Sequence, residues 1–403
     1  MTRLEGQGWL EAPATVAVID ALASAGGDGR FVGGCVRDAL IGRAVADIDI
    51  ATPLPPEAVV RAVTLAGLKA VPTGIEHGTV TVVSGGRPFE VTTLRRDVST
   101  DGRRATVAFT EDWAEDAARR DFRLNALYAD RHGQVFDPTG QGVDDARQGL
   151  IIFVGEPERR IREDYLRILR FFRFRSWFGR GAPDAAALTA CSDLKDGLRQ
   201  LSAERVSTEL LKLLAAPDPR DSVALMQETG VLPVILPWWQ DSGLFEAMAV
   251  ISPDPILRLS SLLPTDAETV RQAAEALRLS NAQKSRLVEA LPDSEVIVPD
   301  MGERAARAAL YRLGRQAFRD RLARAWAAAP NQGEAARALM ATADGWTRPA
   351  FPITGADLKA AGISPSPAMG RILTDLESWW VAEDFPDVGL EGRLAALIQE
   401  SQP

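Results

Sequence analysis

The sequence predicts an α+β fold in which an α/β part, residues 1–148, is followed by an all-helical remainder. From about Arg162 onward Ala, Leu, Arg and Glu dominate in helical patterns that Pro and Gly interrupt. Segments typical of strands, rich in β-branched residues and bounded by Gly, Pro or Asp, lie before that point. They are residues 31–32, 48–50, 79–83, 89–92, 105–109 and 135–137.

The helical remainder is divided by proline-rich segments that are typical of hinges. Residues 216–220 read Ala-Pro-Asp-Pro-Arg, and further breaks lie at 233–239 and 292–299. We therefore expect three regions along the chain, which comprise residues 1–148, 149–215 and 216–403.

Composition limits the class of protein. A chain of 403 residues is long enough for two or more domains. Cys35 and Cys191 are the only cysteines, which implies no disulfide framework and fits a reducing cytoplasm. The N-terminus reads as neither a signal peptide nor an anchor, and no uncharged apolar run is long enough to span a bilayer. We expect a cytoplasmic protein with no membrane partner, and nothing implies a protein partner.

The formal net charge is −9, which taken alone argues against a nucleic-acid partner. Arginines nevertheless crowd two short stretches, and local density matters more than the sum. For the second stretch two interpretations stay open, namely an RNA-binding face or the solvated helix surface of a chain that prefers Arg to Lys. The first stretch holds Arg159, Arg160, Arg162, Arg167, Arg170, Arg173, Arg175 and Arg180, and the second holds Arg304, Arg307, Arg312, Arg315, Arg319, Arg321 and Arg324.

Asp47-Ile48-Asp49 places two carboxylates on either side of one apolar residue. Side chains alternate between faces along a strand, so both aspartates point one way while Ile48 and Ile50 point into a core. Neighbouring carboxylates repel each other, and a divalent cation between them relieves the repulsion. The pattern favours a metal site, although a lone Asp-x-Asp is often a solvated strand edge or a salt-bridge partner.

Gly33-Gly34 follows the apolar pair Phe31-Val32. Two glycines at a strand end permit a positive φ and a close approach of the backbone to a ligand. The stretch from about residue 35 to 40 predicts a short helix whose first N–H groups face an anion. Arg37 lies in the first turn and can add a charge-assisted contact. The combination indicates a polyphosphate on the glycines and Arg37, with Mg²⁺ on the two aspartates.

The string Gly-Gly-x-Val-Arg-Asp…Asp-x-Asp-x-Ala-Thr, residues 33–52, resembles the signature of the class II tRNA nucleotidyltransferase and bacterial poly(A) polymerase family. The resemblance is strong through about residue 215 and weak beyond it. It implies a polymerase-beta-like nucleotidyltransferase head over 1–148, a helical neck with a base-recognition helix over 149–215, and a helical, tRNA-binding body and tail over 216–403. It also implies template-independent addition of CCA to the 3′ end of tRNA from CTP and ATP, with Asp47 and Asp49 holding two Mg²⁺ ions.

A second element of that family is Arg119-Arg120-Asp121-Phe122, followed by Asn125. An arginine fork can grip a triphosphate or a ribose, Asp121 can orient that fork, and Asn125 offers a donor and an acceptor to a sugar hydroxyl. By itself the arginine pair would more often be surface charge. The resemblance implies that this element closes over the nucleotide, so we assign nucleotide binding to Gly34, Arg37 and Arg120.

The third element, residues 163–174, predicts a largely buried helix with a polar residue at every third position from Asp164. Asp164 and Arg167 would share one face, and they pair only with each other if their role is structural. A carboxylate accepts from an exocyclic amino group and a guanidinium donates to a ring nitrogen, so one such pair can accept cytosine and adenine and reject uracil and guanine. The resemblance assigns base reading to Asp164 and Arg167, and implies that Arg170 and Arg173 complete the pocket.

Two further segments carry open expectations. Glu90 lies on an alternating strand near the aspartates, and it is either a third carboxylate that deprotonates the attacking hydroxyl or a strand-edge charge. The polar segment 95–106, broken by Gly102, predicts a mobile loop because it has little apolar surface to bury.

The nearest alternative function is a poly(A) polymerase, which shares the head motifs but adds only A to RNA ends. The segment 390–403 is short and not basic, which favours the tRNA enzyme over polymerases that carry a long basic extension. Specialised CC-adding or A-adding enzymes are further alternatives. A non-catalytic RNA-binding protein on an inactive transferase fold is the last, and the presence of both aspartates argues against it.

Overall fold

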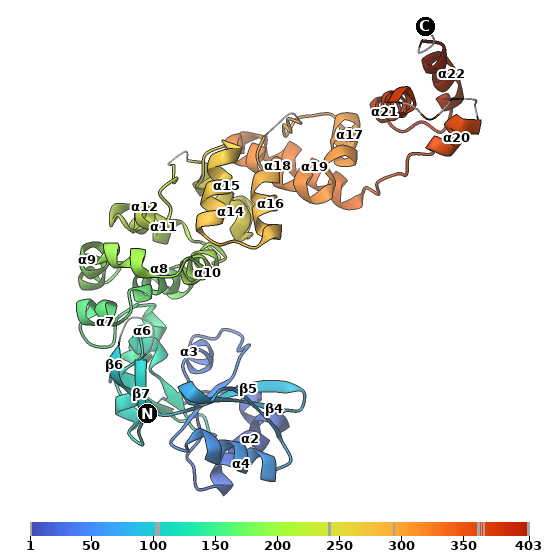
Figure 1. Ribbon diagram of the computed structural model, residues 1–403. Coiled ribbons are helices and arrows are strands. Elements are labelled where there is room, and N and C mark those ends of the chain that lie inside the picture. Colours follow the sequence, from blue (N-terminus) through green and yellow to red (C-terminus); the bar gives the residue numbers. More distant parts are fainter. Residues whose placement is uncertain are drawn as a thin grey trace. The chain divides into compact units, whose positions relative to one another are not determined.

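The computed structural model describes residues 2–100, 105–240, 243–292, 295–360, 363, 365 and 367–400. The chain forms two compact units, Met1–Pro237 and Trp238–Pro403 (Figure 1). The predicted α+β class is confirmed, with a mixed sheet near the N-terminus and helices after it. The expected boundaries after residues 148 and 215 stay predictions. No helix in the described ranges is long and apolar enough to cross a bilayer.

Unit 1 is built on a seven-stranded sheet with the strand order β3-β4-β5-β2-β1-β8-β9. The β2–β5 pair is parallel, and the other neighbours are antiparallel. Buried residues alternate along β4, as a strand with one face on the core requires. The strands are β1 (Arg30–Val32), β2 (Asp49–Thr52), β3 (Lys69–Gly74), β4 (Thr79–Ser84), β5 (Arg87–Thr93), β8 (Tyr128–Ala129) and β9 (Val135–Phe136).

The sheet is covered by helices from the same N-terminal segment. α2 (Pro13–Ser24) contacts α4 (Pro56–Leu65), and both contact β4. α3 (Gly34–Leu40) follows β1 directly, which confirms the short helix expected after the glycines. Short elements complete this part of the chain: α1 (Gly8–Glu11), η1 (Ile75–His77), α5 (Trp113–Ala118), η2 (Arg123–Asn125) and α6 (Gly142–Gln148).

The segment 95–106 contains two strands where a loop was expected from its polarity, and its mobility stays a prediction. β6 (Arg95–Thr100) pairs antiparallel with β7 (Ala105–Phe109) as a separate two-stranded sheet. Strand pairing satisfies backbone hydrogen bonds whatever the polarity of the side chains, which is why polarity alone was misleading. Residues 101–104 of the expected loop lie outside the described residues.

The rest of unit 1 is helical. α8 contacts α10 and α11, and its aromatic side chains pack against the head through Phe122 and Phe153, whose ring centroids are 4.8 Å apart. Phe171 and Phe172 of α8 are fully buried in this region. The helices are α7 (Pro157–Glu163), α8 (Leu166–Phe178), α9 (Ala185–Asp193), η3 (Lys195–Gln200), α10 (Ala203–Leu214), α11 (Arg220–Glu228) and α12 (Val231–Ile235).

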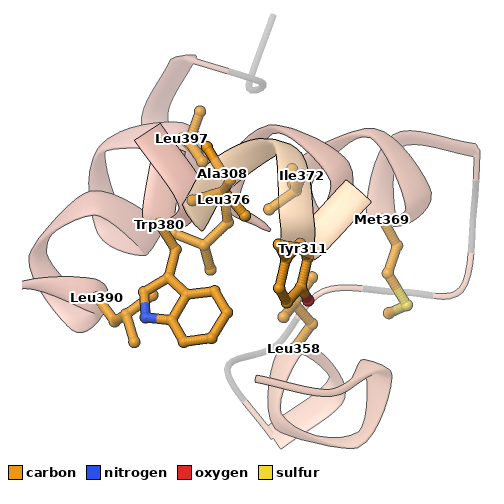
Figure 2. Close-up of a cluster of buried hydrophobic side chains, with 10 residues drawn as sticks. Ala308, Tyr311, Leu358, Met369, Ile372, Leu376, Trp380, Leu390 and Leu397 are labelled. Atoms are coloured by element: carbon orange, nitrogen blue, oxygen red, sulfur yellow. The ribbon is translucent and has the colours of Figure 1, made fainter. Parts of the chain in front are cut away.

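Unit 2 is helical throughout its described residues. One of its cores joins Ala308 and Tyr311 of α17 to Leu358 of α20 and to Leu376 and Trp380 of α21 (Figure 2). The helices are α13 (Leu244–Ile251), α14 (Pro255–Ser261), α15 (Ala267–Ala276), α16 (Asn281–Glu289), α17 (Glu303–Leu313), α18 (Arg315–Ala328), η4 (Pro330–Gln332), α19 (Gly333–Gly345), α20 (Gly355–Ala360), α21 (Pro367–Ala382) and α22 (Leu390–Glu400).

Candidate active site

The two aspartates of the first motif lie at the start of β2. Asp49 is the first residue of the strand, and Asp47 is exposed in the segment just before it. Ile48 and Ile50 are 3% and 0% exposed, so the alternation expected from the sequence is present. The strand itself begins two residues later than the motif. Both carboxylates therefore lie on the side of this segment away from the core.

Glu90 occupies a position next to these aspartates. The parallel register of β2 and β5 pairs Asp49 with Glu90. Burial raises the pKa of Asp49 to about 6, with further increases from Glu90 and Asp47 and an opposing effect of Arg120. A half-buried carboxylate beside like charges is costly to ionise unless a cation neutralises it.

These residues fit a divalent ion that is shared with a substrate. Within the described ranges, no three His, Cys, Asp or Glu side chains form a complete ion site by themselves. Mg²⁺ is commonly held by one or two carboxylates together with water and substrate phosphates. Asp47 and Asp49 offer such a partial set of oxygen ligands.

The glycine turn lies between two guanidinium groups. Gly33 has a φ of 71° and is the N-cap residue of α3. A Cβ atom on Gly33 would lie 3.5 Å from Nη1 of Arg120, and one on Gly34 would lie 3.8 Å from Nη2 of Arg37. Cys35 Sγ is 3.7 Å from the backbone oxygen of Asp49, which ties α3 to β2. The backbone of the turn is thus open to a ligand with positive charge on both sides.

Arg37 and Asn125 are linked, as two parts of one site should be. Arg37 is buried, and its Nη1 donates to Oδ1 of Asn125 at 2.6 Å. Its guanidinium also pairs with Asp38 at 2.8 Å and lies 3.8 Å from the ring centroid of Phe178. The first and second motifs, which are distant in sequence, are therefore in contact.

The arginine fork of the second motif is held by Asp116 and not by Asp121, which corrects the sequence-based expectation. Arg119 and Arg120 pair with Asp116 at 2.7 and 3.0 Å, and the hydroxyl of Tyr128 donates to it at 2.7 Å. Burial alone would raise the pKa of Asp116, but Arg120 and Arg119 outweigh it and lower the pKa to about 2. Asp116 precedes Arg120 by four residues, a spacing that brings side chains together on a helix and that could have identified it.

Asp121 instead joins the second motif to α8. Arg170 Nε donates to Oδ2 of Asp121 at 2.7 Å, and Asn125 Nδ2 donates to Oδ1 at 3.3 Å. Burial would raise the pKa of Asp121, but Arg170 lowers it below its ordinary value. The carboxylate is therefore ionised and fixes α8 against the head.

Asp164 does not belong to the helix that carries Arg167, which is the second correction. It has an extended backbone, with φ −157° and ψ 108°, between α7 and α8. Its carboxylate accepts from the backbone N–H of Leu166 at 3.1 Å, a local bond that favours a helix start over a helix interior. Asp164 pairs with Arg205 at 2.6 Å. Arg167 pairs with Glu163, also at 2.6 Å, so Asp164 and Arg167 do not pair with each other.

Two residues of α10 complete this network and were missed by sequence reasoning. Arg205 holds Asp164, and Glu209 lies 2.7 Å from Nε of Arg173. Glu209 is 5% exposed on a helix face that also buries Val206 and Leu210. A carboxylate on an otherwise apolar helix face needs a cationic partner, and this was the signal in the sequence.

Family models match two parts of the chain. One described as "Poly A polymerase head domain" matches residues 29–152, which include the glycine turn, both aspartates and the arginine fork. Another, described as "Probable RNA and SrmB- binding site of polymerase A", matches residues 183–241.

Whole-chain relatives extend this likeness. The chain is 33% identical over 378 residues to the mitochondrial CCA tRNA nucleotidyltransferase 1 of Mus musculus, with 87% of this chain and 82% of that protein covered. It is 32% identical over 401 residues to the CCA-adding enzyme of Levilactobacillus brevis, with 92% and 94% covered. The structure of the Bacillus stearothermophilus CCA-adding enzyme in complex with CTP matches with a TM-score of 0.77 at 27% identity, over 96% of each chain. The chain therefore belongs to the family of CCA-adding tRNA nucleotidyltransferases.

Proposed function

We propose that this protein adds C, C and A to the 3′ end of tRNA from CTP and ATP, without a template and with release of pyrophosphate. The observation that carries the proposal is the placement of the Gly33–Gly34 turn between Arg37 and Arg120, next to the carboxylate of Asp49. This arrangement suits a nucleoside triphosphate. The family relationship over most of the chain supplies tRNA as the acceptor.

The triphosphate binds at the glycine turn. Gly34 allows the phosphates close to the backbone, and Arg37 and Arg120 contribute charge-assisted contacts from two sides. Asp116 keeps the guanidinium of Arg120 in place. Burial alone would lower the pKa of Arg120, but Tyr128 and Asp116 outweigh it and raise the pKa above its ordinary value.

Enzymes of this family use a divalent metal ion, and we assign Mg²⁺ to Asp47 and Asp49. When bound, Mg²⁺ neutralises the triphosphate and makes the attacking hydroxyl more acidic. We assign to Glu90 the removal of the proton from the RNA 3′-hydroxyl, because its register position next to Asp49 brings a carboxylate to the reacting atoms.

Base selection is assigned to Asp164 and Arg167, although they lie on different elements. Asp164 still has lone pairs for an exocyclic amino group after its bonds to Arg205 and Leu166, since each carboxylate oxygen accepts more than one bond. Glu163 and Arg205 then hold the reading groups in position for cytosine or adenine. Arg170 and Arg173, fixed by Asp121 and Glu209, complete the pocket.

We place the protein in a reducing compartment such as the cytoplasm. Cys35 and Cys191 are both free and buried, and burial raises the pKa of the Cys35 thiol to about 12. Thiols in this state are unreactive and need no oxidising environment.

The test is addition to a tRNA transcript that lacks its CCA end, with products separated at single-nucleotide resolution. CTP alone should add two residues, ATP alone none, and both together three. A ladder of adenosines with ATP alone would assign the chain to the poly(A) polymerases, whose head domain shares the same family model. Arrest after two cytidines with both nucleotides present would identify a CC-adding enzyme, and reaction only on tRNA ending in CC would identify an A-adding one.

A further inference from the structure

A small hollow in unit 1 borders the nucleotide site but is not explained by it. Its volume is about 280 Å³, and α3, α8 and α10 contribute to its walls. Ligand pockets usually measure about 300–1,000 Å³, so this hollow has room for one base and not for a nucleoside triphosphate. Its lining includes Arg37, Arg173, Phe174, Trp177, Phe178 and Lys212.

Aromatic rings in the hollow are covered by cations. The guanidinium of Arg173 is 4.5 Å from the ring centroid of Phe174, and that of Arg43 is 4.9 Å from the centroid of Phe178. Trp177 is fixed from both ends, because its Nε1 donates to the backbone oxygen of Lys212 at 2.8 Å and its own oxygen accepts from Arg43 at 2.9 Å. The indole is therefore held rigidly while its side chain stays only half-buried.

The charges at the hollow are not balanced. Arg37 has Asp38 and Arg173 has Glu209 as ion-pair partners, at 2.8 and 2.7 Å. In the part of the chain that the structure describes, Arg43 and the exposed Lys212 have no carboxylate within ion-pair distance. A purely structural cation–aromatic cluster would explain Arg43, but it gives no role to Lys212.

We propose that this hollow binds the unpaired 3′ strand of the tRNA acceptor end, upstream of the nucleotide being added. A base stacks on Trp177 and Lys212 contacts a flanking phosphate, which is how aromatic and basic side chains together hold single-stranded nucleic acids. Arg43, which is not part of the lining, holds Trp177 through its backbone oxygen. Arg37 and Arg173 line the hollow and are also assigned to the nucleotide, so the hollow lies beside the proposed nucleotide pocket. The inference rests on the proposed function, since it names the part of tRNA that the site holds.

Two variants test the hollow in the full-length protein, Lys212→Glu and Trp177→Leu. Cytidine addition is measured at varied tRNA and at varied CTP. Each variant should raise KM for tRNA roughly fivefold or more, while KM for CTP stays unchanged. Lys69→Glu is the matched control, because Lys69 is an exposed lysine on the edge strand β3 of the same unit and should change neither constant. A rise in KM for CTP alone, or no change in either constant, overturns the proposal.

Binding experiments separate failure of this inference from failure of the proposed function. An RNA stem-loop with an unpaired 3′ extension should bind the two variants more weakly than the parent, and a blunt stem-loop should bind all three equally. Equal weakening on both RNAs would mean that the hollow contacts duplex backbone, which contradicts the proposal. If the parent adds nothing to tRNA, the proposed function fails, yet the binding comparison still decides on the hollow. Because Lys212 is exposed, its variant keeps the test valid if Trp177→Leu does not fold.

Discussion

The two arginine-dense stretches, residues 159–180 and 304–324, differ in how their charges are balanced. In the first stretch two glutamates are each shared by more than one arginine, and both lie on elements around the candidate active site. Glu163 is within ion-pair distance of Arg159, Arg160 and Arg167, and Glu209 is within that distance of Arg170 and Arg173. Arg162, Arg170 and Arg175 also pair with Glu158, Asp121 and Asp221, so the sharing of two glutamates is what distinguishes this stretch.

In the second stretch each arginine has its own acceptor within unit 2. Some reach carboxylates on other elements, and the others donate to backbone carbonyls. The carboxylate pairs are Arg304–Glu383, Arg307–Asp384, Arg312–Glu295 and Arg319–Asp344, and the carbonyl acceptors belong to Trp346 for Arg315, Glu289 for Arg321 and Ser260 for Arg324.

The difference shows that arginines crowded together in a sequence can have different kinds of partner in the fold. The exposed side chains of Arg304, Arg312 and Arg315 fit the solvated-helix interpretation of the second stretch, and the RNA-surface interpretation stays a prediction. The intramolecular bonds of the second stretch join α17 and α18 to segments that precede them and to segments that follow them in the chain. We therefore expect substitutions in the first stretch to change the reaction, and those in the second to change stability.

The largest effect should come from a carboxylate of the proposed metal site. Asp49→Asn should lower turnover about a thousandfold or more, equal to roughly 4 kcal/mol, because the metal ligand is lost. Affinity for tRNA should stay within about twofold of the parent value, since the metal contributes little to RNA contact. Single-turnover addition of CTP measures the first quantity, and filter binding measures the second.

The matched control is an aspartate of unit 2 that pairs with an arginine of the second stretch. Asp384 pairs with Arg307 at 2.6 Å and has a φ of 67°, which Asn tolerates as well as Asp. Asp384→Asn should leave turnover unchanged. If Asp49→Asn turned over at nearly the parent rate at saturating Mg²⁺, Asp49 would not be a ligand of the metal site.

Base selection should weaken when Asp164 is removed. Asp164→Ala loses the acceptor for the exocyclic amino group, and discrimination between CTP and UTP should fall by about 1–3 kcal/mol. Ratios of kcat/KM for the two nucleotides give this quantity directly. Unchanged discrimination would show that the base is read elsewhere and that Asp164 only anchors Arg205.

Asp116, which pairs with Arg119 and Arg120 in unit 1, should affect the stability of the fold. Its folded pKa of about 2 lies below the ordinary value of 3.8, so the ionised carboxylate stabilises the fold by about 2 kcal/mol above pH 4. This stabilisation is lost as the pH falls from about 4 to about 2. Asp116→Asn should therefore unfold earlier than the parent at pH 7 in thermal melts, and the difference should disappear near pH 2. A constant difference across this range would rule out the electrostatic cause.

Local features of the sequence predicted the fold class, the helix after Gly33-Gly34, and the opposite faces of Asp49 and Ile50, because each depends on neighbouring residues only. The short strand β8 and the partner of the arginine fork were not predicted. β8 has two residues and exists because β1 pairs with it. The break at Asp164 was missed because apolar periodicity continues across it, whereas the side-chain bond to Leu166 decides the local backbone. Glu209 left a signal as a carboxylate on an apolar helix face, but the partners of Arg205 and Glu209 became visible only when tertiary contacts placed α10 against α8.

The most direct test of the difference between the two arginine-dense stretches compares Arg167→Gln in the first with Arg312→Gln in the second. Each arginine pairs with one glutamate at nearly the same distance, 2.6 Å for Glu163 and 2.7 Å for Glu295. The measurement is the ratio of kcat/KM for CTP to that for UTP on tRNA lacking CCA. We predict that Arg167→Gln lowers this ratio about tenfold, within the range of one base contact, and that Arg312→Gln leaves it unchanged. Equal ratios for the two variants would contradict the assignment of the first stretch to the nucleotide and the second to the fold.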